Sequence, residues 1–235
     1  MASAAASRLV ELQERAAVEQ RLGWRLEEQA DAVAHELIVE EIRRLRPDDG
    51  LLSEEGFDDG TRTEKRRTWI VDPLDGSSPF GQGSPEWAVH VALAIDGEPA
   101  IGAVAVPGLD MLGTTQNPPD RAEDHSDGNL VVVTGWSRSR TDGVRVAPQL
   151  NARLFACSSA GFKVMLVATG RADVYVHGSP LYEWDVCAPA AVALAAGLHV
   201  SDASGEVLRF NQGHPVVPSL VVCRPELAER VLLTM

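Results

Sequence analysis

The chain has 235 residues, which is enough for one large domain or two small ones with a sizeable buried core. With 45% hydrophobic and 23% charged residues, its composition is that of a globular protein and excludes general disorder. Because 34 Asp and Glu residues outnumber 21 Lys and Arg residues, the formal net charge is −13, which argues against broad nucleic-acid binding.

The first half of the chain opens with a predicted helix over residues 27–46. Its apolar residues recur at steps of three and four, the spacing of one helix face, and Pro47 with the Asp-Asp-Gly turn behind it ends the helix. Residues 1–26 are predicted to be helical as well, with a weaker apolar face. The apolar face of the predicted helix comprises Ala30, Val33, Ala34, Leu37, Ile38, Ile42 and Leu45.

Short strands follow this helix. A buried run, Thr-Trp-Ile-Val, stops at an Asp-Pro pair, and two apolar runs flank an Asp-Gly turn, which is typical of a hairpin. A polar stretch rich in turn-forming residues then predicts a loop. The predicted strands cover residues 68–71, 88–95 and 100–106, and the predicted loop covers residues 114–129.

The second half mixes strands with helices, two of which are closed by glycines. Because both element types occur in both halves, we predict a layered α/β or α+β architecture, with an N-terminal half over residues 1–128 and a C-terminal half over residues 129–235. The predicted strands cover residues 130–134, 173–176, 199–201, 207–210 and 220–222, and the predicted helices cover residues 161–169, 185–196 and 225–233.

Residues 69–78 carry two carboxylates immediately after the first predicted strand. Pro73 stiffens the turn and Gly76 lets the backbone bend, so Asp72 and Asp75 can converge on one point. Converging carboxylates repel one another unless a cation neutralises them, and an all-oxygen set suits Mg²⁺, Mn²⁺ or Ca²⁺. Taken alone, such a run is more often an Asx turn than a site.

Other acidic and hydroxyl residues also lie near the ends of predicted elements. Residues 76–78 offer backbone N–H groups and hydroxyls at a possible helix start, where a phosphate can bind. Glu54 and Glu55 follow an apolar pair and lie at the end of another element, although, taken alone, they are better explained as a solvated acidic turn. Asp185 begins an apolar helix and could be its N-cap, but its Trp and Val neighbours indicate a half-buried place where an unpaired carboxylate is costly.

Together these motifs resemble the inositol monophosphatase superfamily of Mg²⁺-dependent, lithium-sensitive phosphatases. In the family's order, residues 52–55 look like its upstream metal-binding glutamate segment, residues 69–77 like its first signature and residues 183–197 like its second. The resemblance covers roughly residues 27–230. Within the superfamily it is closest to the CysQ-like 3'(2'),5'-bisphosphate nucleotidases of actinobacterial type, as residues 85–90, 159–163 and 208–211 indicate.

The resemblance implies a metal site that binds two or three Mg²⁺ ions. Glu54, Asp72 and the backbone carbonyl of Leu74 would bind one ion, Asp72, Asp75 and Asp185 a second, and Glu54 also a third. One ion would lower the pKa of an attacking water, and another would stabilise the leaving alkoxide. By the same resemblance, Mn²⁺ is expected to substitute for Mg²⁺ and Li⁺ to inhibit.

The resemblance also assigns residues that orient the water and bind the substrate. Asp31, on the early helix, and Ser77, where the family usually has Thr, would orient the attacking water, although Asp31 could instead be a polar residue of the helix surface. Phosphate would be bound by Gly76, Ser77 and Ser78. Further substrate contacts are implied for Ser137, Arg140, Ser159 and Lys163.

Some of these positions depart from the family pattern or have a simpler explanation. Arg140 stands where the family has His, and it could grip a second phosphate or be an exposed loop charge. Lys163 could be a helix lysine that extends to solvent. Gly178 replaces the substrate-binding Glu of inositol monophosphatases, which argues against inositol phosphate as the main substrate. Scattered histidines, His90 among them, are expected to be structural or exposed.

The fold implied by the resemblance is an α/β (α+β) layered α/β/α/β/α sandwich of the inositol monophosphatase and fructose-1,6-bisphosphatase type, with the site between its two halves. The implied activity is Mg²⁺-dependent hydrolysis of the 3'-phosphate of adenosine 3',5'-bisphosphate or of its sulfated relative. One alternative is a phosphatase for a sugar phosphate, inositol phosphate, fructose 1,6-bisphosphate or nucleoside monophosphate, in specialised metabolism. Another is a catalytically inactive module that senses a phosphorylated ligand.

The remaining sequence features concern location and partners. Cys157, Cys187 and Cys223 lie far apart and form no Cys/His cluster, so a zinc site is not expected and a reducing compartment is indicated. The N-terminus has no continuous apolar segment, and no apolar run approaches the ~18 residues of a membrane span. We therefore expect a cytoplasmic protein that binds a small phosphorylated substrate, without nucleic acid or membrane, and a homodimer.

Overall fold

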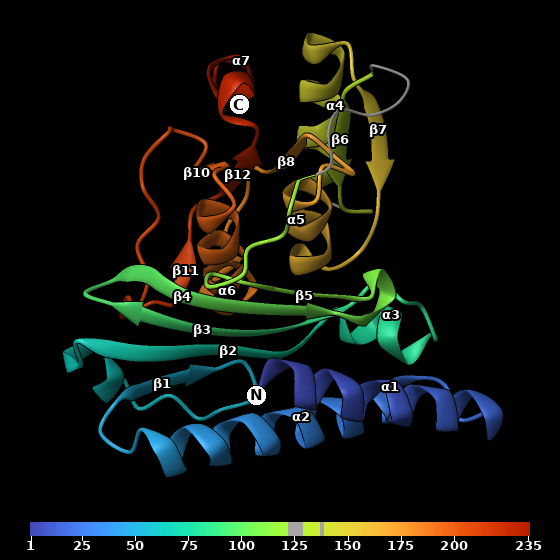
Figure 1. Ribbon diagram of the computed structural model, residues 1–235, viewed down its shortest axis with the longest axis vertical. Helices are drawn as coiled ribbons and strands as arrows, with labels where there is room; N and C mark the ends of the chain where they lie inside the picture. The colour runs from blue at the N-terminus through green and yellow to red at the C-terminus, as the bar shows by residue number, and fades with distance from the viewer. Residues whose placement is uncertain (122–128, 137–138) are drawn as a thin grey trace.

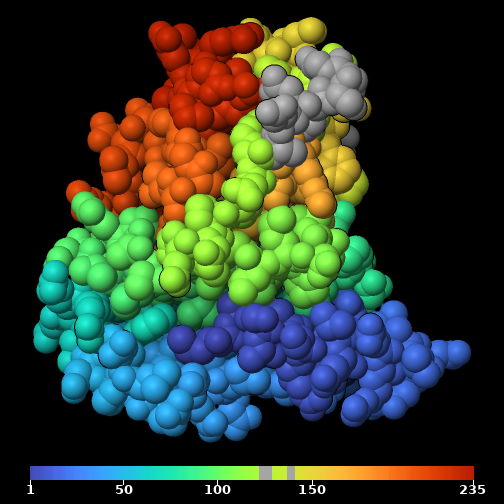
Figure 2. Space-filling view, viewed as in Figure 1, coloured from blue at the N-terminus to red at the C-terminus, as the bar shows by residue number. Residues whose placement is uncertain are grey.

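The computed structural model describes residues 1–121, 129–136 and 139–235, and of Ser139 and Arg140 only the backbone. Its elements stack in alternating layers of helix, sheet, helix, sheet and helix (Figure 1). The space-filling view shows the blue N-terminal helices at the bottom, the green strands above them and the red C-terminal end at the top (Figure 2). The expected α/β/α/β/α sandwich is thereby confirmed.

The first sheet has the strand order β1-β2-β3-β4-β5. β1 and β2 are parallel, whereas the other neighbouring pairs are antiparallel. The predicted hairpin is present, and both residues of its Asp-Gly turn have a positive φ. β5 has no counterpart among the predicted strands. The strands are β1 (Gly50–Ser53), β2 (Arg67–Asp75), β3 (Ala88–Ile95), β4 (Glu98–Val106) and β5 (Met111–Thr114).

The outer face of this sheet is covered by α1 (Ala2–Val18) and α2 (Trp24–Leu45). The helix predicted for residues 27–46 is confirmed, although it begins three residues earlier. A turn over residues 19–23 separates it from α1. Its buried face follows the predicted spacing and comprises Leu26, Ala30, Ala34, Ile38, Val39 and Ile42.

The predicted end of β2 at Asp72-Pro73 is wrong, because the strand continues to Asp75 through a β-bulge. Asp72 pairs with His90 and Asp75 with Ala88, so three residue steps on β2 face two on β3. Pro73 has no N–H for the ladder, which explains why the extra residue is accommodated here. Residues three apart in a regular strand point to opposite faces, whereas the inserted residue brings both carboxylates to one face.

Two helices, α5 (Ala160–Ala168) and α6 (Glu183–Ala195), lie between the sheets and form the centre of the core. Both were predicted to within two residues of their observed starts. Every residue of α5 is buried, and α6 packs against β3 and β4. Apolar residues surround both helices because each meets a sheet on either side, which is typical of a fully buried helix.

The second sheet has the strand order β10-β12-β8-β6-β7. Its outer face is covered by α4 (Ser139–Leu150) and α7 (Ala228–Leu232). The strands predicted near residues 131, 174, 200 and 221 are confirmed. The strands of this sheet are β6 (Val131–Thr134), β7 (Arg153–Ala156), β8 (Val174–His177), β10 (His199–Ser201) and β12 (Leu220–Cys223).

The second half also differs from its prediction in three segments. The predicted strand at residues 207–210 is wrong: Val207 is 68% exposed, and the Phe210 N–H donates to the Gly97 carbonyl of the β3–β4 turn at 3.0 Å. α4 was not predicted because a glycine and a proline interrupt its sequence. β7 was not predicted either, and its side chains are largely exposed.

The remaining elements are short. The helix predicted over residues 225–233 is divided into a 3₁₀ turn and α7. Within the described residues, no helix is long and apolar enough to cross a bilayer. The short elements are η1 (Thr61–Glu64), α3 (Ser77–Gly81), η2 (Pro107–Leu109), β9 (Leu181–Tyr182), β11 (Val216–Val217) and η3 (Pro225–Leu227).

Candidate functional site

Three predicted aspartates converge between the first sheet and the central helices. One carboxylate oxygen from each of Asp72, Asp75 and Asp185 lies within 4.8 Å of the other two. Asp72 and Asp75 come from the bulged end of β2, and Asp185 comes from the first turn of α6. Residues more than a hundred positions apart in the chain therefore build one acidic cluster.

Glu54 lies beside Asp72 because β1 runs parallel to β2. Ser53 pairs with Val71, and the Glu54 N–H donates to the Val71 carbonyl at 3.2 Å, which brings the glutamate level with Asp72. The two carboxyl groups are close enough for each to shift the pKa of the other. Loss of water on the side facing the cluster, together with the charges of neighbouring carboxylates, raises the pKa of Glu54 to about 7 although its side chain reaches solvent.

Asp72 is the most confined member of the cluster, with 1% of its surface exposed. Its Oδ1 accepts a hydrogen bond from the Leu74 N–H at 3.0 Å, whereas its Oδ2 has no hydrogen-bond partner among the described residues. Burial and the charges of Asp75, Glu54 and Asp185 raise its pKa well above the usual range. The charged form of Asp72 therefore requires a positive partner.

The pKa of Asp75 is shifted in the opposite direction. Burial alone would raise its pKa, but the nearby His90 imidazole, the Ser159 hydroxyl and the Lys163 charge lower the pKa of Asp75 to about 2. The Ser159 hydroxyl donates to Asp75 Oδ2 at 2.5 Å, and the Gly161 N–H donates to the same oxygen at 2.7 Å. Asp75 is consequently ionised at neutral pH, whereas the raised pKa values of Glu54, Asp72 and Asp185 favour their protonated forms.

His90 contributes to the cluster, although the sequence indicated only a structural or exposed residue. It is fully buried, its Nε2 lies 3.3 Å from Asp75 Oδ2, and its Nδ1 lies 3.1 Å from the Trp184 carbonyl. A Cβ at Gly161 would lie 2.0 Å from His90 Nε2, so only glycine fits there. The usable signal was a histidine inside an otherwise apolar strand next to the acidic strand.

The acidic cluster fits a hard divalent cation. Its donors are all oxygen atoms, and one of them is a buried oxygen with no hydrogen-bond partner in the part of the chain that the structure describes. Burial, together with the charges of neighbouring carboxylates, raises the pKa of Asp185 to about 7. Several buried carboxylates at such separations repel one another, and a cation among them removes that cost. The described residues thus form a cluster that could hold a metal ion.

Asp31 and Ser77, predicted to orient water, lie next to each other. The Ser77 hydroxyl lies 3.3 Å from Asp31 Oδ1 and 3.1 Å from the Leu74 carbonyl oxygen, and it can donate to either. Burial and the charges of Glu55 and Glu27 raise the pKa of Asp31 to about 7. The pair therefore sits at the edge of the acidic cluster and connects α2 to α3.

The residues predicted to contact the substrate fall into three groups. Gly76 precedes α3 with a φ of +100°, and Ser78 is exposed on that helix. Ser159 and Lys163 are buried, and the Lys163 ammonium donates to the Ser159 carbonyl at 2.6 Å. Ser137 and the Arg140 side chain lie outside the described residues.

Asp185 is not the N-cap of α6, the alternative role that its sequence context allowed. Tyr182 is the N-cap of α6, and Asp185 lies three residues later, where its carboxylate accepts from the Tyr182 N–H at 3.2 Å. This contact uses Asp185 Oδ2 and holds the side chain at the start of the helix. Asp185 therefore completes the cap without being the N-cap.

Comparison with known proteins finds relatives along almost the whole chain. Residues 4–234 match the sequence model of the inositol monophosphatase family. The chain is 38% identical over 217 residues to the 3'-phosphoadenosine 5'-phosphate phosphatase of Mycobacterium bovis, covering 89% of this chain and 81% of that protein. It is 34% identical over 195 residues to the 3'(2'),5'-bisphosphate nucleotidase CysQ of Salmonella typhimurium, covering 77% and 78%. The crystal structure of CysQ from Bacteroides thetaiotaomicron matches with a TM-score of 0.69 and 29% identity over 83% of each chain.

Proposed function

Because the chain belongs to the inositol monophosphatase family, we propose that it is a Mg²⁺-dependent enzyme that removes the 3'-phosphate of adenosine 3',5'-bisphosphate or of its sulfated relative. The chain is a phosphoric monoester hydrolase, as its relatives are. The observation that carries the proposal is the convergence of Asp72, Asp75 and Asp185.

The proposed ligands of the metal come from both halves of the chain. Glu54, Asp72 and Asp185, whose pKa values are raised, would release their protons when the cation binds, whereas Asp75 is already ionised. The backbone carbonyl of Leu74 is a further proposed ligand. Divalent cations bound there would neutralise phosphate charge and acidify the attacking water.

Asp31 and Ser77 are proposed to position that water. When the Ser77 hydroxyl donates to Asp31, its oxygen lone pairs are free to accept a hydrogen bond from a water at the cluster. A carboxylate with a pKa of about 7 is suited to accept a proton at neutral pH. We therefore propose that the Asp31–Ser77 pair orients the nucleophile and takes up its proton.

Binding of the phosphorylated substrate is proposed at Gly76, Ser77 and Ser78, with Ser137, Arg140, Ser159 and Lys163 as the other predicted contacts. At Gly178, where inositol monophosphatases carry a glutamate, the N–H donates to the Asp142 carboxylate at 2.7 Å, and a side chain would require that carboxylate to move. The missing glutamate supports a substrate other than inositol phosphate.

A substrate panel with phosphate release as the readout tests the proposal. Adenosine 3',5'-bisphosphate is expected to show a kcat/KM at least about tenfold above that of fructose 1,6-bisphosphate, inositol 1-phosphate or a nucleoside 5'-monophosphate. EDTA should abolish the activity. Equal rates for all four substrates would overturn the nucleotidase assignment, and full activity in EDTA would overturn the metal requirement.

Replacement of Asp31 by Asn is expected to lower kcat by roughly 10²- to 10³-fold, because Asn cannot take up a proton. Substrate KM and Mg²⁺ binding should stay within about twofold of wild type, since Asp31 is not a proposed ligand. Steady-state kinetics and calorimetry measure these quantities. Glu28→Gln, an exposed position on the same helix, is the control. An unchanged kcat in Asp31→Asn would contradict the assigned role.

The location and the assembly of the enzyme stay predictions. We expect the enzyme to act in the cytoplasm as a homodimer, without nucleic acid or membrane. Sedimentation of the purified chain at micromolar concentration would measure the oligomeric state. The small phosphorylated substrate is consistent with the phosphatase relatives.

A further inference from the structure

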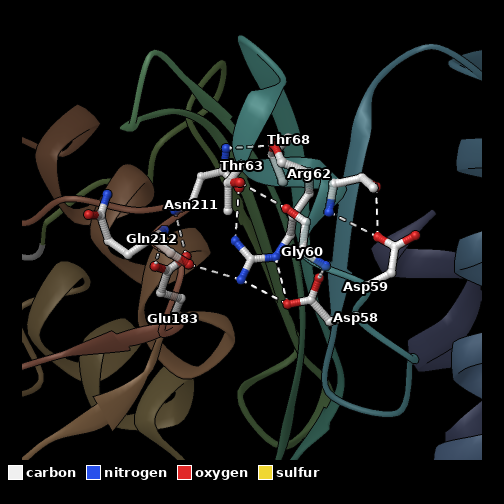
Figure 3. A network of polar contacts seen from close by, with 10 residues as sticks. Asp58, Asp59, Gly60, Arg62, Thr63, Thr68, Glu183, Asn211 and Gln212 are labelled. Carbon is white, nitrogen blue, oxygen red and sulfur yellow. Dashed lines mark hydrogen bonds and ion pairs between the residues drawn. The ribbon is translucent and has the colours of Figure 1, made fainter.

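A buried polar network joins the loop that follows Glu54 to the start of α6 (Figure 3). Arg62 belongs to η1 in the N-terminal half, whereas Glu183 is the first residue of α6 in the C-terminal half. The network thus spans the same two halves that supply Glu54 and Asp185. We name it the clamp, and its members are Asp58, Arg62, Glu183, Asn211 and Gln212.

Arg62 is the centre of the clamp, and only 2% of its surface is exposed. Its guanidinium donates to Asp58 Oδ2 at 3.0 Å, to Asn211 Oδ1 at 2.9 Å and to the Gln212 carbonyl at 2.9 Å. Asp58 neutralises the charge, and the planar fork of the guanidinium fixes the directions of the other two bonds. Such a buried group allows little relative movement of the segments it joins.

Glu183 is fully buried and binds the other side of the loop that carries Asn211 and Gln212. The two carboxylate oxygens of Glu183 accept from the N–H groups of Asn211 at 2.6 Å and Gln212 at 2.8 Å. The side-chain amide of Asn211 also donates to the Arg62 carbonyl at 3.0 Å. An unbroken series of hydrogen bonds therefore leads from Arg62 to the first residue of α6.

Glu183 and Asp185 are two residues apart on α6, so their side chains point about 200° apart around the helix axis. Glu183 points toward the other members of the clamp, whereas Asp185 points toward Asp72 and Asp75. On the premise of the metal site proposed above, we propose that Arg62 and Glu183 are positioning residues, which hold the start of α6 so that Asp185 reaches a cation shared with β2. Ligand geometry must be held to within about 0.5 Å for such a site to bind tightly.

Two variants test the clamp through Mg²⁺ binding, measured by calorimetry and by the rise in melting temperature on Mg²⁺ addition. Asn211→Gly removes the bridging amide, and glycine accepts the φ of +60° at this position without strain. Arg62→Lys keeps the charge beside Asp58 but loses the planar fork. Both variants are expected to weaken Mg²⁺ binding roughly 10- to 100-fold while the metal-free protein stays folded.

Arg209→Met is the matched control, because it removes an arginine two residues before Asn211 whose ion pair with Glu98 is exposed. Its Mg²⁺ affinity should stay within about twofold of wild type. Wild-type affinity in Asn211→Gly overturns the positioning role whether or not Arg62→Lys folds, and so does equal weakening in the control. Absence of Mg²⁺ binding in the wild type overturns the proposed function as well, so the wild-type titration distinguishes the two failures.

Discussion

Replacement of Asp72 by Asn is expected to abolish phosphatase activity and, at pH 8, to raise the melting temperature of the metal-free protein. Asn retains the acceptor for the Leu74 N–H but removes the charge that a cation would share with Asp75 and Asp185. We expect kcat/KM to fall at least about a thousandfold, or about 4 kcal/mol of transition-state stabilisation. Removal of a carboxylate buried among carboxylates should raise the metal-free melting temperature by about 2–4 °C.

The opposite signs of these two effects make the Asp72→Asn experiment specific. A substitution that merely damaged the fold would lower activity and melting temperature together. Asp96→Asn is the control, since Asp96 is an exposed aspartate in an ion pair with Arg66, and both quantities should match wild type. Retention of more than about a tenth of the activity in Asp72→Asn would contradict the role of the acidic cluster.

The metal-free protein is expected to lose stability as pH rises. Burial raises the pKa of Asp31, Glu54 and Asp185 to about 7, well above the value of an unfolded carboxyl group. The folded state therefore binds more protons than the unfolded state between about pH 4 and pH 7, and stability falls across that window. Asp75 has a pKa of about 2, so its contribution to stability is complete above about pH 4. It therefore does not change the free energy of unfolding between about pH 4 and pH 7.

Thermal melts in EDTA and in Mg²⁺ at pH 5 and pH 8 measure this effect. The metal-free melting temperature should be at least about 5 °C lower at pH 8 than at pH 5. Mg²⁺ should stabilise the protein more at pH 8, because its ligands are then deprotonated. In Asp185→Asn, the metal-free melting temperature should fall less between pH 5 and pH 8 than it does in the wild type. A metal-free melting temperature that rises from pH 5 to pH 8 would refute the raised pKa values.

Local patterns indicated the candidate residues only in combination. Taken alone, the Asp-Pro-Leu-Asp-Gly run, the Glu54 segment and the Glu-Trp-Asp start of a helix each had a simpler explanation, and it was their joint occurrence in one order that resembled a phosphatase family. The α2, α5 and α6 helices were also predictable, because their apolar spacing or composition is continuous. α4 was missed since Gly143 and Pro148 lie within it, and its helix depends on packing against β6 and β8.

The arrangement of the site depended on contacts between distant segments. The spacing of Asp72 and Asp75 suggested a turn after a strand, whereas pairing with β3 makes a bulge that turns both to one face. His90 looked like a scattered histidine until β3 placed it against Asp75.

By itself, the sequence determined which residues are candidates for binding a cation and a phosphoryl group, because side-chain chemistry and local spacing are properties of neighbouring residues. The tertiary structure alone decided which of them meet. The bulge in β2, the buried His90 beside Asp75 and the Arg62–Glu183 clamp arise from strand pairing and from packing of α6 between two sheets. No short stretch of sequence specifies such a long-range contact by itself, since the contact is defined only once both partners are folded.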